Sequence, residues 1–260
     1  MPNSMRNVVH PVFMPIFDSK TGALACYEAL ARTHSGYEHG PLLFTAEKYG
    51  FIHSIDVTML DQVVTLMRLH PNVKMSVNVS VRTIEHDGAD YLSAVYKHMD
   101  VISRIVFEIT ETVQISDMKQ IRTFIEAVRV LGGRIAVDDF GSGYFSMSEI
   151  EAINPDFVKL STDFVNEIEG RAGEILFLRD RVNGYRGGRI IAEHVDSLEK
   201  LVLLSRLGIE LTQGYFWGKP LEYHFLPHVS QYADIYQELV SDGLFVLGNN
   251  EIYANNRVII

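Results

Sequence analysis

Two adjacent carboxylates end an apolar run in the stretch "RIAVDDFGSGY" (134–144). Asp138 and Asp139 follow the strand-like residues "RIAV", and a Gly-Ser-Gly sequence comes directly after Phe140. Glycine allows the chain to turn sharply at this point. We therefore interpret Asp138 and Asp139 as candidate metal ligands at the end of a buried strand.

The same pattern recurs along the chain, because most other strand-like runs also end in a polar residue. These residues are Glu28, Asn78, Glu108, Lys159, Glu193 and Gln213. In an α/β barrel the C-terminal ends of the strands meet at one rim, so these side chains would line a single cup. So many carboxylates cannot all stay ionised without cations between them.

Oxygen ligands of this kind favour Mg²⁺ or Mn²⁺, and the sequence lacks the His and Cys spacing of a zinc site. An aspartate shared by two ions would place them roughly 3.5–4 Å apart, an arrangement that holds a phosphoryl group during in-line displacement. Taken singly, each residue has an ordinary interpretation as a turn former, a helix cap or a solvated charge. Their joint occurrence at successive strand ends favours the site.

The elements that would position this cup are short β-rich runs separated by segments of helical periodicity. The predicted strands are 12–17, 25–31, 74–79, 104–109, 134–138, 157–160, 189–193 and 209–214. Eight such strands with intervening helices in 260 residues favour a (β/α)8 barrel. A doubly wound open sheet is the alternative from periodicity alone.

Three helix starts can be predicted from capping residues. Ser54 precedes an apolar stripe that ends before Pro71, and Ser116 precedes a stripe that Gly132 closes. Asp196 or Ser197 opens a third helix.

Composition limits the function classes. The net charge of −10 and the pI of about 5.4 do not suggest a surface for nucleic-acid polymers. The single cysteine, Cys26, cannot form an internal disulfide, and no run approaches the roughly 18 apolar residues of a membrane span. We expect a soluble, cytoplasmic protein.

Seven motifs occur in an order and spacing that resemble the EAL domain family, the bacterial cyclic di-GMP phosphodiesterases. They are "YEALAR" (27–32), "SVNVS" (76–80), "FEITET" (107–112), "DDFGSGY" (138–144), "DFVKL" (156–160), "AEHVD" (192–196) and "QGYFWGKP" (213–220). The resemblance implies a modified TIM barrel in which one strand near the N-terminus, 12–17, is antiparallel. It implies hydrolysis of cyclic di-GMP to linear pGpG, with two Mg²⁺ or Mn²⁺ ions.

By motif, the resemblance assigns Glu28, Asn78, Glu108 and Asp138 to one ion, with Asp138 bridging to a second ion held by Asp139 and Glu193. It makes Lys159 the catalytic lysine and Gln213 a residue that positions water or phosphate. Arg32 and Asp196 would contact substrate. Glu111 would anchor the loop 140–146, which in the family also contributes to a homodimer.

Four positions depart from the family pattern. Ser161 stands where an aspartate is usual, His194 where a glycine is usual, Asp196 where a glutamate is usual, and Phe145 where a serine is usual. All proposed metal ligands are present, so these departures concern the surroundings of the ions. We expect an active enzyme with a reduced rate. The alternative is a catalytically weak EAL protein that acts as a cyclic di-GMP receptor or protein-interaction regulator, and a generic two-metal phosphatase is a more distant possibility.

We expect the barrel to occupy residues 1–222, with no sensory or GGDEF-like segment beside it. Residues 223–260 are expected to form an appendage of unknown role, with a helix in "SQYADIYQELV" and strand-like residues after it.

Overall fold

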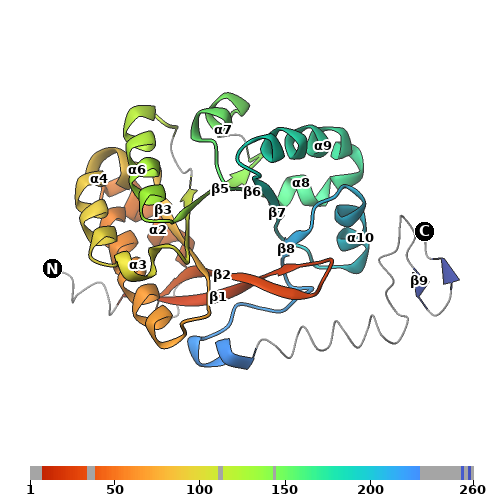
Figure 1. Ribbon diagram of the computed structural model, residues 1–260, viewed down its shortest axis with the longest axis horizontal. Coiled ribbons are helices and arrows are strands. Elements are labelled where there is room, and N and C mark those ends of the chain that lie inside the picture. The colour runs from red at the N-terminus through yellow and green to blue at the C-terminus, as the bar shows by residue number, and fades with distance from the viewer. Residues whose placement is uncertain are drawn as a thin grey trace.

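The computed structural model describes residues 8–33, 39–110, 114–142 and 145–228, together with 253–254 and 257–258. Eight strands of this part of the chain close into a barrel in sequence order (Figure 1). They are β1 (Val9–Asp18), β2 (Ala23–Thr33), β3 (Met75–Ser80), β4 (Ile105–Thr110), β5 (Arg134–Phe140), β6 (Phe157–Leu160), β7 (Arg189–Ala192) and β8 (Leu211–Gln213).

The first strand runs against its two neighbours. β1 pairs antiparallel with both β2 and β8, whereas the other neighbouring strands pair in parallel. Ile16 lies opposite Gln213 where β1 meets β8, and this pairing closes the barrel. The predicted modified TIM barrel is therefore confirmed, including its antiparallel strand, and the open-sheet alternative is wrong.

Helices surround the barrel (Figure 1). They are α2 (His39–Tyr49), α3 (Ile52–Leu69), α4 (Val81–Tyr96), α5 (Met99–Ile102), α6 (Met118–Val130), α7 (Met147–Ile153), α8 (Thr162–Asn166), α9 (Ile168–Gly184), α10 (Leu198–Arg206) and the 3-10 helix η1 (Tyr223–His228). The main apolar core joins strand residues such as Phe107 to helix residues such as Leu60 and Phe124, all of them buried. This core fixes the strands and therefore the residues at their ends.

The helix starts agree only partly with the sequence. Ser197 caps α10 as predicted, because its side chain accepts a hydrogen bond from Lys200 N. The Ser54 prediction is wrong: α3 begins at Ile52, so Ser54 lies within its first turn. Asp117 caps α6 in place of Ser116, because the longer carboxylate reaches two backbone N–H groups and the Ser116 hydroxyl donates to Glu85 instead.

Side chains inside the barrel lie in three tiers, because alternate residues of a strand face the same side. The upper tier, at the C-terminal ends, is polar: Glu28, Asn78, Glu108, Asp138, Lys159, Glu193 and Gln213. Two residues earlier on the same strands lies a middle tier of apolar and small residues: Cys26, Ser76, Val106, Ala136, Phe157, Ile191 and Leu211. A lower tier two residues earlier again includes Lys74, Arg104, Arg134 and Arg189. The upper end of the barrel is thus rich in carboxylates, whereas the lower end is rich in cations, one of which, Arg189, pairs with Asp18 and Glu210.

The end of the chain is described only in part. η1 contacts the barrel, where the Tyr27 hydroxyl donates to Leu226 O at 3.0 Å, and the two-residue strands β9 (Tyr253–Ala254) and β10 (Arg257–Val258) pair with each other. The helix predicted in "SQYADIYQELV" lies outside the described residues. Within the described ranges, no helix has the length and apolar character needed to cross a membrane.

Candidate active site at the C-terminal end of the barrel

The buried ammonium of Lys159 lies at the centre of the upper tier. Its Nζ is 2.8 Å from Glu108 Oε2, 2.9 Å from both Asp138 Oδ1 and Glu193 Oε1, and 3.1 Å from Glu28 Oε2. Residues from β2, β4, β5 and β7 therefore meet at one lysine from β6. The expected convergence of strand-end residues is present in the structure.

The electrostatics of this cluster are dominated by an excess of carboxylates. Burial alone would lower the pKa of Lys159, but the carboxylates around it, Asp138 foremost, raise that pKa well above its usual value. Burial raises the pKa of Glu108 to about 8 against the opposing charge of Lys159, and it also raises the pKa values of Asp138 and Glu193. One ammonium therefore does not neutralise the site.

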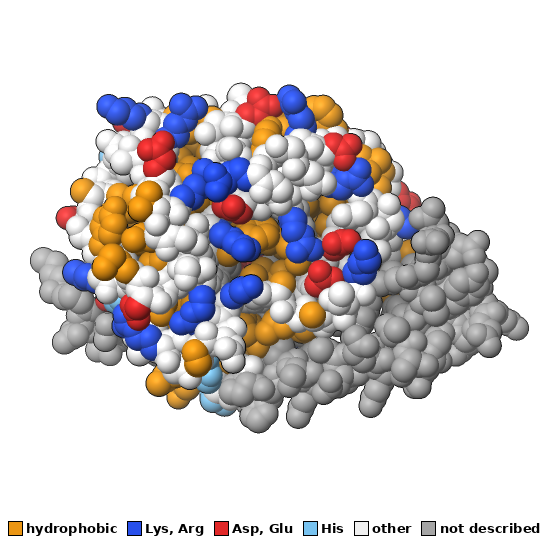
Figure 2. Space-filling view, in the orientation of Figure 1, with side chains coloured by type: hydrophobic (Ala, Val, Ile, Leu, Met, Phe, Trp, Pro, Cys, Tyr) orange, Lys and Arg blue, Asp and Glu red, His pale blue; other side chains and the backbone are white. Residues whose placement is uncertain are grey.

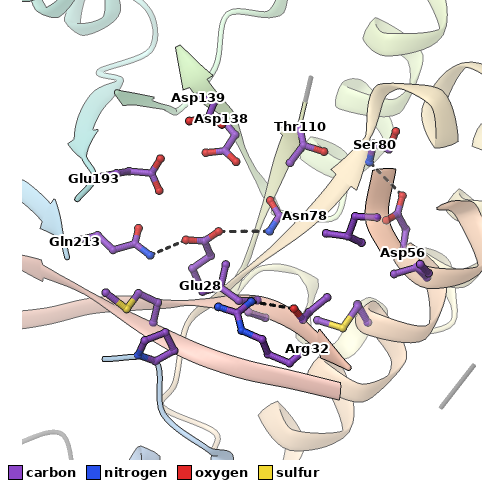
Figure 3. Close-up of a pocket in the computed structure, with 18 of the residues that line it drawn as sticks. Glu28, Arg32, Asp56, Asn78, Ser80, Thr110, Asp138, Asp139, Glu193 and Gln213 are labelled. Carbon is purple, nitrogen blue, oxygen red and sulfur yellow. Dashed lines mark hydrogen bonds between the residues drawn. The ribbon is translucent and has the colours of Figure 1, made fainter. Parts of the chain in front are cut away.

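Glu28 is the exception, because amides hold its ionised form. Burial would raise its pKa, but Lys159 and the hydrogen bond from Gln213 outweigh burial and lower the pKa. Gln213 Nε2 donates to Glu28 Oε2 at 2.6 Å, and Asn78 Nδ2 donates to Glu28 Oε1 at 3.4 Å (Figure 3). Both amides therefore orient the Glu28 carboxylate.

The upper tier also has the geometry of a divalent-cation site. One ligand oxygen each of Glu28, Glu108 and Asp138 lies within 4.8 Å of the others. An ion bonded to oxygens at roughly 2.0–2.6 Å can bridge atoms at such separations. Asn78 Oδ1 and Glu108 Oε1 are buried and have no hydrogen-bond partner among the described residues. These acceptor atoms and the uncompensated charge fit a cation.

Asp139 and Glu193 complete the carboxylate set in different ways. Glu193 is buried and contacts Lys159, whereas Asp139 is exposed and lines the same pocket (Figure 3). Asp139 has a φ of 53°, in the left-handed region that Asp adopts more readily than most residues. This backbone conformation allows two successive aspartates to lie on one pocket.

The pocket above the upper tier has a volume of about 750 Å³. Its polar floor includes Glu28, Asp138 and Gln213, and one wall is apolar, with Leu43, Ile52, Ile55 and Met59. Pockets of roughly 300–1,000 Å³ are typical of small-molecule sites. This pocket can hold a ligand that has both a charged and an apolar part.

The two predicted substrate residues both line this pocket. Arg32 is half-buried, and its Nη1 donates to Ala31 O at 2.9 Å, which leaves other guanidinium N–H groups for a ligand (Figure 3). Asp196 is exposed and forms an ion pair of 2.9 Å with Lys200. In this ion pair Lys200 donates a hydrogen bond to Asp196, and this hydrogen bond lowers the pKa of Asp196.

The departures from the family pattern have structural counterparts. His194 has a φ of 53°, a conformation that glycine adopts without the steric cost of a Cβ. Its Nδ1 shares a hydrogen bond of 2.7 Å with Thr162 Oγ1. Ser161 is buried, and its Oγ has no hydrogen-bond partner in the described part of the chain. Phe145 packs in the main apolar core.

Asp56, on α3, lines the pocket but was not identified from the sequence. Its Oδ2 accepts a hydrogen bond from Thr83 Oγ1 at 2.6 Å. It also accepts one from Ser80 N at 3.1 Å (Figure 3). Burial raises the pKa of Asp56 to about 7 although both hydrogen bonds oppose the shift. The sequence signal that could have identified Asp56 is an acidic residue directly after Ile55, in the apolar stripe of this helix.

Glu111, predicted to anchor the loop 140–146, lies outside the described residues, as do Gly143 and Tyr144 in that loop. Its role stays a prediction.

Comparison with known proteins identifies relatives of the whole barrel. The EAL domain family model matches residues 3–220. The chain is 30% identical over 226 residues to the probable cyclic di-GMP phosphodiesterase PdeI of Escherichia coli K12, covering 82% of this chain and 29% of PdeI. It is 28% identical over 222 residues to MucR of Pseudomonas aeruginosa, a bifunctional diguanylate cyclase/cyclic di-GMP phosphodiesterase, covering 80% of this chain and 32% of MucR. The chain thus spans about a third of the length of these relatives.

Solved structures agree with this similarity. The PaMucR phosphodiesterase in its c-di-GMP complex superposes with a TM-score of 0.75 at 26% identity, covering 86% of this chain and 96% of that one. An EAL domain protein of Listeria monocytogenes EGD-e has a TM-score of 0.76 at 18% identity, covering 89% and 94% of the two chains, and supports the fold alone. The chain belongs to the EAL domain family.

Proposed function

We propose that this chain is a metal-dependent phosphodiesterase that hydrolyses cyclic di-GMP to linear pGpG and so lowers this second messenger in bacterial signalling. The observation that carries the proposal is the convergence of Glu28, Glu108, Asp138 and Glu193 on Lys159 at the floor of the pocket. The names of the relatives and the family membership support the choice of substrate.

Two divalent cations, Mg²⁺ or Mn²⁺, are part of this proposal. Glu28, Asn78, Glu108 and Asp138 would hold one ion, and Asp138 would share the second with Asp139 and Glu193. When bound, such ions activate water and offset charge on phosphoryl oxygens. The unpartnered Asn78 Oδ1 and Glu108 Oε1 give the chain acceptor atoms for this purpose.

Formation of pGpG requires that one P–O3′ bond breaks. The oxygen of water bonds to phosphorus, and a proton passes to the leaving O3′. Arg32 is placed to bind a non-bridging phosphate oxygen, because it lines the pocket and a guanidinium matches phosphate geometry. The apolar wall beside Met59 offers a surface for a flat guanine base.

Lys159 acts as a fixed positive charge in this scheme. Its raised pKa keeps it protonated, so it is a poor general base. Its ammonium can hold the attacking oxygen and stabilise the charge that develops on the phosphoryl group. We therefore expect Lys159→Ala to lower kcat far more than it raises KM, measured by steady-state kinetics. A mutant that loses substrate affinity but keeps its single-turnover rate would identify Lys159 as a substrate-binding residue instead.

The direct test is an assay of the purified chain with cyclic di-GMP and Mn²⁺ or Mg²⁺, with pGpG quantified by chromatography. We expect pGpG to form, EDTA to stop the reaction, and added Mn²⁺ to restore it. Ca²⁺ should inhibit, because it prefers longer bonds and more ligands.

The same assay separates the enzyme from a receptor. The strained backbone of His194 and the unpartnered Ser161 hydroxyl favour a reduced rate. Tight binding of cyclic di-GMP without pGpG formation over hours would support the receptor and contradict the enzyme. Absence of both binding and hydrolysis would leave a protein-interaction role.

A homodimer and a cytoplasmic location also belong to this proposal. The family resemblance of the loop 140–146 supports the dimer, and the unpaired thiol of Cys26 is compatible with a reducing compartment. Sedimentation velocity over a concentration series would test the dimer: a single monomeric species at all concentrations would contradict it.

A further inference from the structure

A second cavity lies inside the barrel, beneath the active site. Its volume is about 330 Å³, and it is lined mainly by residues of the middle and lower tiers, with Glu108 of the upper tier at its inner end. TIM-barrel interiors are normally filled by bulky branched side chains. Here β2 and β3 contribute only the small side chains of Cys26 and Ser76 to the lining of the cavity.

The two sides of this cavity differ in polarity. Ile16, Ile191 and Leu211 form a buried apolar cluster on one side, with Phe157 packed against it. Ser76 lies on the other side of the cavity, and its buried Oγ has no hydrogen-bond partner among the described residues. The cavity therefore offers apolar surface and one unpartnered hydroxyl.

The mouth of the cavity is cationic. Lys74, Arg104, Arg134 and Arg189 all line the cavity, together with one carboxylate at this end, Asp18. Arg104 is engaged by backbone carbonyls such as His70 O, and Arg189 lies 3.4 Å from Asp18. By contrast, no hydrogen bond or ion pair joins the side chains of Lys74 or Arg134 to another described residue.

The charge of this region is opposite to that of the chain as a whole. The net charge of the chain is −10, yet four of the cavity's lining residues are Lys or Arg, against the two acidic residues Asp18 and Glu108. Figure 2 shows one face of the molecule on which Lys and Arg side chains gather near the centre, with hydrophobic and some Asp and Glu side chains between them. Cations that lie beside apolar surface and lack a carboxylate partner suit an anionic group.

We propose that this cavity is a binding site for a small monoanion with an apolar body, such as a medium-chain carboxylate. Lys74 and Arg134 bind the anionic group at the mouth, and Ile16, Ile191 and Leu211 contact the apolar body. The volume lies near the lower limit for small-molecule sites, so the occupant is far smaller than cyclic di-GMP.

The site also communicates with the upper tier. Glu108 lines the inner end of the cavity and contacts Lys159 at 2.8 Å. An occupant would therefore lie against a carboxylate of the proposed metal site. By thermodynamic linkage, any effect of the occupant on Mn²⁺ affinity must be matched by an equal effect of Mn²⁺ on its own affinity.

The experiment is a titration of the purified chain with octanoate by isothermal calorimetry, without substrate. We expect saturable one-site binding. The double variant Lys74→Gln/Arg134→Gln should weaken it by about tenfold or more, because two charge-assisted contacts are lost. Lys119→Gln/Arg122→Gln, which removes the same charge from the exposed face of α6, is the matched control and should change affinity less than about twofold. Equal weakening in both variants would reduce the effect to overall charge and overturn the site.

The ligand classes provide a second control. Acetate has the charge without the apolar body, and octan-1-ol has the chain without the charge, so both should bind much more weakly than octanoate. Comparable binding of either one would contradict the proposed chemistry.

Cys26 is the only cysteine of the chain and lines the cavity, so it reports the location of the occupant. Octanoate should slow its reaction with methyl methanethiolsulfonate, followed by mass spectrometry, over the concentration range of the calorimetric titration. Burial raises the pKa of the Cys26 thiol to about 12, and the thiolate is the reacting form, so the reaction is followed over hours at alkaline pH. An unchanged rate at saturating octanoate would place the ligand elsewhere and overturn the proposal. Neither measurement uses cyclic di-GMP, so the outcome is independent of the proposed enzymatic function.

Discussion

The carboxylates of the upper tier can be buried together because Lys159 lies between them. Its ammonium is within 3.1 Å of four carboxylates, yet it supplies only one positive charge. Burial raises the pKa values of Glu108, Asp138 and Glu193, and the single charge of Lys159 does not offset it. These residues are thus arranged to bind cations strongly, and protons compete with the cations for the carboxylates.

Asp138 is the carboxylate that the two proposed ions would share. Asp138→Asn keeps the side-chain shape but removes the charge shared by the two proposed ions, so kcat should fall by more than about a hundredfold. Steady-state kinetics with saturating Mn²⁺ checks this, and circular dichroism checks that the barrel remains folded. Glu169→Gln, an exposed carboxylate on α9, should leave kcat unchanged. Normal turnover in Asp138→Asn would refute the metal assignment.

His194 has a φ of 53°, a backbone conformation that costs free energy for a residue with a Cβ. His194→Gly removes that strain and also the contact with Thr162, so we expect a net gain of up to about 1 kcal/mol in the free energy of unfolding. Urea denaturation measures this change. The double variant His194→Gly/Asp196→Glu should also raise kcat. The reason is that a side chain misplaced by about 1 Å near the chemistry can cost on the order of a hundredfold in rate. A destabilised and slower double variant would show that the His194–Thr162 contact is needed.

At the scale of elements, α3 and α4 are joined through one buried acid. Asp56 on α3 accepts hydrogen bonds from Ser80 N, at the start of α4, and from Thr83 in its first turn. Its pKa rises from 3.8 to about 7 on burial. Because the folded pKa exceeds the unfolded value, this contribution to stability is full below about pH 4 and is lost as the pH rises through about 7.

We therefore expect the free energy of unfolding to fall between about pH 4 and about pH 7 and to level off above that, by an amount on the order of 4 kcal/mol at most. Asp56→Asn keeps an acceptor for Ser80 and Thr83 but cannot ionise, so it should flatten this part of the profile. Urea melts at a series of pH values make the comparison. Parallel profiles for the two proteins would mean that Asp56 is not the titrating group.

The start of α6 gives another element-scale prediction. Asp117 accepts hydrogen bonds from Lys119 N and Gln120 N. Asp117→Ala removes this cap and should cost about 1 kcal/mol of the free energy of unfolding, measured in urea. Thr123→Ala, an exposed change within the same helix, is the control. An equal cost in both variants would show that the cap contributes nothing specific.

For the whole molecule, the charged upper tier couples metal binding to stability. An ion that binds only the folded chain stabilises it by mass action, by about 2.7 kcal/mol at a concentration one hundred times its Kd. Mn²⁺ should therefore raise Tm, EDTA should reverse the increase, and the increase should be much smaller in Asp138→Asn. Scanning calorimetry measures Tm with Mn²⁺, after addition of EDTA, and in Asp138→Asn with Mn²⁺. A Tm that ignores Mn²⁺ would contradict the proposed site.

Most of the upper tier follows from the sequence alone. The strand-like runs end in Glu28, Asn78, Glu108, Asp138, Lys159, Glu193 and Gln213, and strand ends must meet once the sheet closes. Periodicity left an open sheet as an alternative, and the order of the seven EAL motifs favoured the barrel. The period of two along a strand is a local property, so it can be identified without knowing the neighbours.

The partners of the buried and capping side chains depend on the packing of the elements. Asp56 looks like a surface acid until α3 is packed against α4, and Asp117 rather than Ser116 caps α6 because Glu85 from α4 binds the serine hydroxyl. The cavity beneath the site is lined by the small side chains of Cys26 and Ser76 on one side and by Ile191 and Leu211 on the other. These features arise from contacts between residues distant in sequence, and neither periodicity nor motif spacing contains that information.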